Sequence, residues 1–279
     1  MSFSVHDFYD CACELGEGLF LSKSGSAAWV DINKRNIFWT ESGVLMVLPT
    51  ESKPSVIYDM TDTEIEFGSD LGICVINKKS GHETVKIARP SAIETPWRGN
   101  DGCKIGDTYY LGFMHDLEPD SNPGFVYQFA GGKWTLISKQ IHIPNTFVDL
   151  LDGRLLISDS YCQEVYVFDT SVTHNERHLP EKILWSRFVN GAPDGGCRVG
   201  SSIAIASWDA SAIEIFAPDG THVRTLDLPV SRPTNCKFDA DRGKLWVTSA
   251  TVGLEPAMIE KFPMSGGTLV LDFSGQAQC

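Results

Sequence analysis

Several features typical of nucleic-acid-binding and membrane proteins are missing from this sequence. Lysine and arginine total 23 against 36 aspartates and glutamates, a formal net charge of −13, and no stretch is rich in basic residues. Because nucleic-acid binding needs clustered positive charge, we expect no nucleic-acid partner. No apolar run reaches the ~20 residues that span a bilayer, and residues 1–7 lack the layout of a signal peptide. We therefore expect a cytoplasmic protein without a membrane partner, either a monomer or a weak homo-oligomer.

Familiar catalytic and metal-binding motifs are also absent. The eight cysteines are scattered without C-x-x-C spacing, which argues against a zinc ribbon or a thioredoxin-type centre. Cys11 and Cys13 are close enough in sequence to bind a metal or to oxidise, but no paired motif supports either role. There is no G-x-S-x-G elbow, and the histidines lack H-E-x-x-H spacing.

The pattern that is present is a repeat of short β-type runs separated by Gly, Asp, Asn and Pro. These runs recur at about 40 to 48 residues, the spacing of four-stranded propeller blades. The six clearest runs are residues 27–31, 71–76, 109–114, 155–159, 203–208 and 245–249. We predict an all-β fold, a six-bladed β-propeller of four-stranded antiparallel blades, formed by one domain over residues 1–279. A strand near the N-terminus should pair with the last blade, because an open edge invites aggregation.

Oxygen-bearing side chains recur about ten residues before these runs. They are Glu17, Asn100, Asn145, Asp194 and Asn235, and residues 61–67 of the second unit offer no clear equivalent. Asn and Asp also cap turns through their own side chains, but turn capping does not require one register in successive blades. The innermost strands of a propeller line its central channel, so these residues should converge there. Carboxylate and amide oxygens suit one divalent cation: calcium, magnesium, manganese or, less typically, zinc.

The ordered series of short motifs resembles the senescence-marker-protein/gluconolactonase family, which includes regucalcin and bacterial sugar lactonases. The stretches that carry the resemblance are 15–18, 29–32, 98–102, 111–114, 151–153, 158–160, 193–195, 228–230, 233–235 and 246–249. The resemblance implies a divalent cation held by Glu17, Asn145 and Asp194. It also implies hydrolysis of a sugar lactone to the aldonic acid. Substrate contacts would come from Arg98 and Asn100, with Asp101 adjacent, and from an acidic residue that corresponds to Asp116 or Glu118.

These residue types suit the implied chemistry, with Asp194 as the candidate to accept a proton from water. Three departures from the family pattern make the substrate uncertain: Thr146 follows Asn145, Leu19 follows Gly18, and Arg198 brings a positive charge after the Pro-Asp-Gly motif. Two other functions stay open. One is a propeller that binds calcium or carbohydrate without catalysis, and the other is a hydrolase of other small esters or lactones.

Three further side chains are weaker candidates near the predicted mouth of the channel. Trp97 and Trp208 could stack on a sugar ring, although tryptophans more often pack between blades. His115 could contact a substrate, although a histidine on a surface loop is the commoner case.

Overall fold

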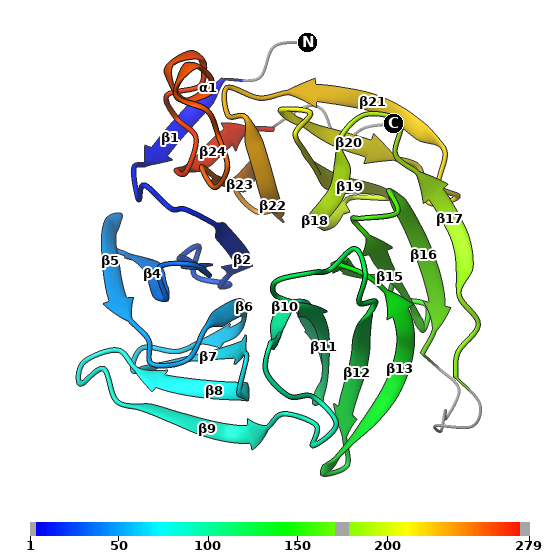
Figure 1. Ribbon diagram of the computed structural model, residues 1–279. Coiled ribbons are helices and arrows are strands. Elements are labelled where there is room, and N and C mark those ends of the chain that lie inside the picture. The colour runs from blue at the N-terminus through cyan, green and yellow to red at the C-terminus, as the bar shows by residue number, and fades with distance from the viewer. Residues whose placement is uncertain (1–3, 171–178, 274–279) are drawn as a thin grey trace.

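The structure is a computed structural model that describes residues 4–170 and 179–273. Within these residues, 24 strands form six four-stranded antiparallel sheets, arranged around a central axis as the blades of a propeller (Figure 1). The predicted fold class is confirmed.

Each blade contains one innermost strand followed outward by three more. Blade 1 comprises β2 (Gly16–Leu21), β3 (Ala27–Asp31), β4 (Asn36–Glu41) and β5 (Val44–Pro49). Blade 2 comprises β6 (Pro54–Met60), β7 (Glu64–Ser69), β8 (Gly72–Asn77) and β9 (Glu83–Ala88). Blade 3 comprises β10 (Trp97–Ile105), β11 (Thr108–His115), β12 (Gly124–Ala130) and β13 (Lys133–Ile141). Blade 4 comprises β14 (Pro144–Asp149), β15 (Arg154–Asp159), β16 (Glu164–Asp169) and β17 (Ile183–Arg187). Blade 5 comprises β18 (Ala192–Val199), β19 (Ser202–Trp208), β20 (Ala212–Phe216) and β21 (His222–Asp227).

Blade 6 closes the ring by combining the two ends of the chain. It contains β22 (Arg232–Asp239), β23 (Lys244–Ala250) and β24 (Thr268–Asp272), and its outermost strand is β1 (Val5–Tyr9). Phe8 pairs with Leu269 and Tyr9 with Thr268, so the first strand lies beside the last (Figure 1). This confirms the predicted closure. The short helix α1 (Pro256–Lys261) lies between β23 and β24, and no described helix is long and apolar enough to cross a membrane.

The hydrophobic core is divided among the contacts between blades. Six clusters of buried apolar side chains are present among the described residues, and each joins two neighbouring blades. At the closure, the fully buried Trp29 of blade 1 stacks on Phe38 with ring centroids 5.9 Å apart. Tyr9 of β1 lies 5.9 Å from the same indole. Burying one such aromatic side chain contributes roughly 1.5–3 kcal/mol, so packing across this seam stabilises the closed ring.

The register predicted for blade 2 was wrong by one strand. In the other blades the predicted run is the second strand, whereas residues 71–76 lie on β8, the third. The true second strand is β7, which contains the buried carboxylate of Glu66. Its charge is neutralised by Lys86 and Lys104, and it accepts a hydrogen bond from Tyr109 at 2.8 Å. The innermost strand of this blade is therefore β6, which lies before residues 61–67, the segment where the predicted repeat has no clear polar residue.

Candidate functional site

A cavity of about 220 Å³ opens at the central channel, at the end where the innermost strands begin. Its lining residues are Leu15, Glu17, Arg98, Asn100, Met114, Ile143, Asn145, Ser160, Tyr161, Ala192, Asp194 and Trp208. Five of the predicted site residues, from blades 1, 3, 4 and 5, are thus brought together. Residues that recur along the sequence therefore lie together around one cavity.

An irregularity in each innermost strand accompanies these positions. The pairing of β2 with β3 shifts register after Glu17, and the pairing of β14 with β15 shifts after Asn145. Equivalent shifts occur in β10 and β18. A bulge of this kind bends the strand and redirects a side chain, here at the positions where the strands present polar groups.

The residue that follows the site position has a left-handed backbone in two of these bulges. Gly18 has a φ of +61°, and a Cβ there would lie 2.4 Å from the carbonyl oxygen of Ser55. Thr146 has a φ of +55° and is fully buried. Its hydroxyl donates to the carbonyl oxygen of Asp194 and accepts a hydrogen bond from Ser158 at 2.9 Å. The Asn-Thr departure is therefore accommodated in a strained conformation that is held by hydrogen bonds.

The floor of the cavity contains a pair of buried carboxyl groups. Glu17 and Asp194 are each 5% exposed, and one would donate a hydrogen bond to the other when protonated. Burial, together with the nearby charge of Asp101, raises the pKa of Glu17 to about 8. Burial and the charge of Glu17 raise the pKa of Asp194 well above its usual range. Asp194 Oδ1 has no hydrogen-bond partner among the described residues.

An ion-pair network fixes the guanidinium of Arg98 at the wall of the cavity. Its Nε donates to Asp116 Oδ1 at 2.7 Å, and Nη1 donates to the carbonyl oxygen of Gly99 and to Asn100 Oδ1. Asp116 also accepts a 2.6 Å bond from Lys53 Nζ of blade 2. Burial opposes ionisation of Asp116, but the bonds from Lys53 and Arg98 outweigh it and lower its pKa. Arg98 is therefore held in place while Nη2 can still donate to a ligand.

The two asparagines continue this network across the floor. Asn100 Nδ2 donates to Asn145 Oδ1 at 2.9 Å and to the carbonyl oxygen of Pro144 at 3.0 Å. Asn145 Nδ2 donates to Ser160 Oγ at 2.9 Å, and Ser160 donates to the carbonyl oxygen of Pro193. These contacts orient the amide oxygen of Asn145, and they connect blades 3, 4 and 5.

The profile of the SMP-30/gluconolactonase/LRE-like region matches residues 15–251, which include all of these site residues. The chain belongs to this family. It is 29% identical, over 96% of its length and 93% of the relative's, to a protein of Rhizobium meliloti strain 1021 whose name assigns it to the sugar lactone lactonases. It is 26% identical to the pentonolactonase XacC of Haloferax volcanii, over 86% of this chain and 83% of that one. Among solved structures, a protein of Agrobacterium tumefaciens described as the calcium-binding protein regucalcin shares the fold, with a TM-score of 0.85 at 23% identity over 98% of this chain and 95% of that one.

Of the residues that the SMP-30/gluconolactonase resemblance implied for the site, Asp101, Asp116 and Glu118 do not line the cavity in the described structure. Asp101 is buried, and its carboxylate accepts a 2.8 Å bond from the backbone N–H of Gly102. Burial raises the pKa of Asp101, and the charge of Lys237 opposes this rise. Asp116 forms an ion pair with Arg98, whereas Glu118 is exposed on the loop after β11.

The remaining predicted candidates are also placed. Asn235 is buried and packs against Gly195: a Cβ added to Gly195 would lie 2.2 Å from the Cγ of Asn235. Asn235 is not among the described residues that line the cavity. Trp208 lines the cavity, whereas Trp97 packs edge-on against His115, with centroids 5.1 Å apart. Arg198 lines a different cavity, further along the innermost strands with Lys104 and Lys237. Arg198 is therefore not among the residues that line the central cavity.

Sequence reasoning missed two residues that line the cavity, Ser160 and Tyr161, and a third residue, Ser55, that lies outside the described lining. Ser55 occupies the second-blade position on β6, and its buried hydroxyl has no partner among the described residues. The signal was available, because Pro54 precedes it as Pro144 precedes Asn145. Ser160 and Tyr161 lie in the turn after β15 and also line the cavity. Ser160 lies in the stretch 158–160 that carries the family resemblance, but no pattern in the sequence marked Ser160 or Tyr161 as lining the cavity.

Proposed function

We propose that this protein hydrolyses a sugar lactone to the aldonic acid, using a divalent cation at the floor of the central cavity. Membership in the SMP-30/gluconolactonase family supports this function, as do relatives named as a sugar lactone lactonase and a pentonolactonase. The observation that carries the proposal is the buried pair Glu17 and Asp194 beneath an open cavity.

The residues present fit a hard divalent cation. Burial is the main reason that the pKa values of both carboxyl groups are raised; the charge of Asp101 adds to it for Glu17, and the charge of Glu17 adds to it for Asp194. A cation offsets these negative charges, and Asp194 Oδ1 is a buried acceptor that lacks a partner. Glu17, Asn145 and Asp194 would hold the ion through two carboxylates and one amide oxygen, a donor set that calcium, magnesium and manganese accept. Asn145 is already oriented for this role by Asn100 and Ser160.

The bound cation would polarise the lactone carbonyl and stabilise negative charge that develops on its oxygen. Asp194 would accept a proton from the attacking water at a carboxylate oxygen, because it is a buried carboxylate with an unused acceptor at the floor. Arg98 Nη2 and Asn100 would orient oxygen atoms of the substrate. Fixed donors of this kind hold the ester in position for attack.

The cavity wall suits a ring with both polar and apolar faces. Tyr161 and Trp208 lie on the rim side of the lining, and aromatic rings of this kind stack on the C–H face of a sugar. Leu15, Met114 and Ile143 add apolar surface. This combination favours a sugar lactone over a fully charged substrate.

Proton release from a panel of aldonolactones tests the proposal. Metal-stripped protein would be supplied separately with calcium, magnesium, manganese and zinc, and the spontaneous opening of each lactone would be subtracted. Asp194→Asn should lower turnover by at least about 10²-fold, the lower end of what a general base contributes. Asp62→Asn, which removes an exposed turn carboxylate, is the matched control and should keep full activity.

The possible outcomes separate the functions. Metal-dependent turnover that disappears in Asp194→Asn supports the lactonase. Metal binding to folded protein without turnover of any lactone or small ester would overturn it in favour of a binding propeller. Turnover that is confined to apolar lactones or simple esters would keep the hydrolase but reject the sugar substrate. Equal rates for the wild type and Asp194→Asn would remove this residue from the mechanism.

A further inference from the structure

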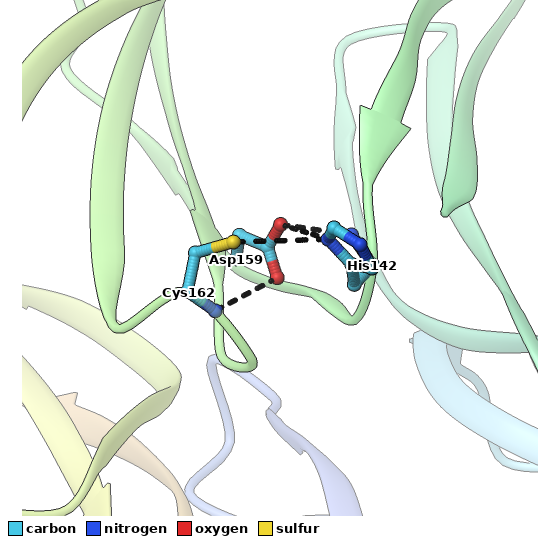
Figure 2. Close-up of side chains that lie close together, drawn as sticks. All are labelled: His142, Asp159 and Cys162. Carbon is cyan, nitrogen blue, oxygen red and sulfur yellow. Dashed lines mark hydrogen bonds and ion pairs between the residues drawn. The ribbon is translucent and has the colours of Figure 1, made fainter. Parts of the chain in front are cut away.

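A second group of metal-ligating side chains lies beside the cavity, outside the residues assigned to the cation above. His142 precedes β14, Asp159 ends β15, and Cys162 lies in the turn that follows (Figure 2). One ligand atom from each of the three lies within 4.8 Å of the others. Ser160 and Tyr161, which line the cavity, lie between Asp159 and Cys162 in the sequence. The group therefore belongs to the rim of the site.

The spacing of these atoms suits a small tetrahedral cation. His142 Nδ1 lies 3.1 Å from Asp159 Oδ2 and 3.7 Å from Cys162 Sγ. Zinc bonds of 2.0–2.3 Å in tetrahedral geometry place N, O and S ligand atoms about 3.3–3.6 Å apart. The two observed separations fall on either side of that range, and the third, between the ligand atoms of Asp159 and Cys162, is at most 4.8 Å. A thiolate, an imidazole and a carboxylate form a donor set typical of zinc or a similar transition-metal ion, and unlike the all-oxygen set of the floor.

The repeat itself provides a comparison that separates the ligand set from the scaffold. In blade 1, Asp31 accepts backbone N–H bonds from Glu14, Leu15, Asn33 and Lys34. In blade 4, Asp159 accepts the corresponding bonds, which come from His142, Ile143, Tyr161 and Cys162.

The backbone bonds therefore account for the buried carboxylate in both blades, and they place one further residue on each side of that carboxylate. Blade 1 has Glu14 and Lys34 at these two positions, where Lys34 contacts the carbonyl oxygen of Ala12. Blade 4 has His142 and Cys162 there instead, which the scaffold does not require.

The geometry does not suit a nucleophilic triad. In a Cys-His-Asp triad, the carboxylate and the thiol contact opposite nitrogens of the imidazole. Here both lie beside Nδ1, as Figure 2 shows. Three ligand atoms that converge on one side of the ring can share one cation.

We propose that His142, Asp159 and Cys162 form a second metal site, which binds zinc or a similar divalent transition-metal ion at the rim of the cavity. Cys162 is exposed, so the site is open to solvent and the fourth ligand would be water. Binding would fix the turn that carries Ser160 and Tyr161. Since Ser160 contacts Asn145, occupancy would also steady one side of the floor. The inference does not depend on the lactonase proposal.

Cobalt(II) is the direct probe, because a thiolate ligand gives it a charge-transfer band that oxygen ligands do not. Reduced, metal-stripped full-length protein would be titrated with cobalt in excess calcium, which competes for the oxygen ligands of the floor. We expect one equivalent of cobalt to bind with the thiolate band. Zinc should displace the cobalt and should also protect Cys162 from alkylation, measured by peptide mass spectrometry.

Two ligand variants and two matched controls complete the test. Cys162→Ser should abolish the band, and His142→Asn should weaken cobalt binding by at least the ~10–100-fold that follows the loss of an outer-shell partner. Cys103→Ser and His82→Asn remove a cysteine and an exposed histidine from other blades and should bind cobalt as the wild type does. Glu17→Gln alters only the floor and should leave the band intact. A band that persists in Cys162→Ser, a band that disappears in Cys11→Ser instead, or alkylation of Cys162 at the same rate with saturating zinc would overturn the proposal.

Discussion

Replacing Asp116 with asparagine tests whether Asp116 positions Arg98 or touches the substrate itself. The carboxylate accepts charged hydrogen bonds from Arg98 at 2.7 Å and Lys53 at 2.6 Å, and Asp116 is not among the residues that line the cavity. Asp116→Asn keeps the shape of the side chain but leaves both cations without their counter-charge. We expect Arg98 to lose its fixed orientation, so that KM rises while kcat changes less.

The magnitude follows from the burial of the partners. Breaking a fully buried ion pair by removing one member costs about 3–5 kcal/mol, but the side chain of Asp116 is 28% exposed and that of Lys53 is 19% exposed. Solvent screening lowers the expected loss to about 1–3 kcal/mol. This loss is a loss of folding stability. KM changes through the weakened contact of Arg98 with the substrate, and losing a charge-assisted hydrogen bond of about 1.5 kcal/mol corresponds to a rise in KM of roughly tenfold.

The assay pairs urea denaturation of metal-stripped protein with lactone kinetics at saturating metal, so that metal binding does not obscure the change in stability. Lys53→Met is the matched control, since it removes a contact to the same carboxylate without touching the lining. It should lower stability but leave KM unchanged. Because the pKa of Asp116 is lowered, its stabilising contribution is present above the unfolded pKa of about 3.9 and is lost as the pH falls through the lower, folded value. The difference between wild type and Asp116→Asn should accordingly vanish in acid. A fall in kcat with unchanged KM would refute the reasoning and place Asp116 at the reacting atoms.

Two further substitutions test the fold around the site. Gly18→Ala should lower the free energy of unfolding by more than the ~1–2 kcal/mol of left-handed strain alone, because the new Cβ would also collide with Ser55. Gly43→Ala is the control: Gly43 has a φ of +78° and open space around it, so this variant should show only the strain. Equal losses in urea denaturation would contradict this. Burial opposes ionisation of Glu66, but its bonds to two lysines and a tyrosine outweigh burial and lower its pKa, so Glu66→Gln should destabilise the protein by about 1–2 kcal/mol at pH 7. This loss should shrink as the pH falls below ~4.3, while Glu64→Gln, an exposed change on the same strand, should have little effect at either pH.

The sequence was sufficient to predict the six-bladed ring and most of the floor, because both depend on local signals. An innermost strand begins with a turn residue and an oxygen-bearing side chain, and an apolar second strand follows it. Glu17, Asn145 and Asp194 each show this order, and the structure brings them to one cavity. Closure by β1 also followed from a general need to cover an open edge.

The failures arose where distant residues decide the outcome. The buried Glu66 of β7 is neutralised by lysines from β9 and β10, and the local sequence does not identify these partners. Ser55 was missed because an error of one strand in blade 2 hid its place in the repeat. Asp101 follows Asn100 directly, but the bulge in β10 directs its side chain away from the cavity. Sequence spacing specifies which residues share a strand, and it does not specify where a bulge reverses the alternation.

The proposed ligands of the floor and those of the rim occupy different positions of the same repeat, so the two groups can change independently. The floor uses residues near the start of the innermost strands of blades 1, 3, 4 and 5, where the left-handed step at Gly18 or Thr146 and close contacts between blades restrict substitution. The rim uses the residues on either side of a buried carboxylate, Asp31 or Asp159, which accepts backbone N–H bonds in both blades. Because only the backbone of these flanking residues is needed, their side chains are free to differ, as Glu14 and His142 do. Chemistry at the floor can therefore stay constant while the rim acquires new ligands or a new specificity, and blade 4 is where this chain shows such a change.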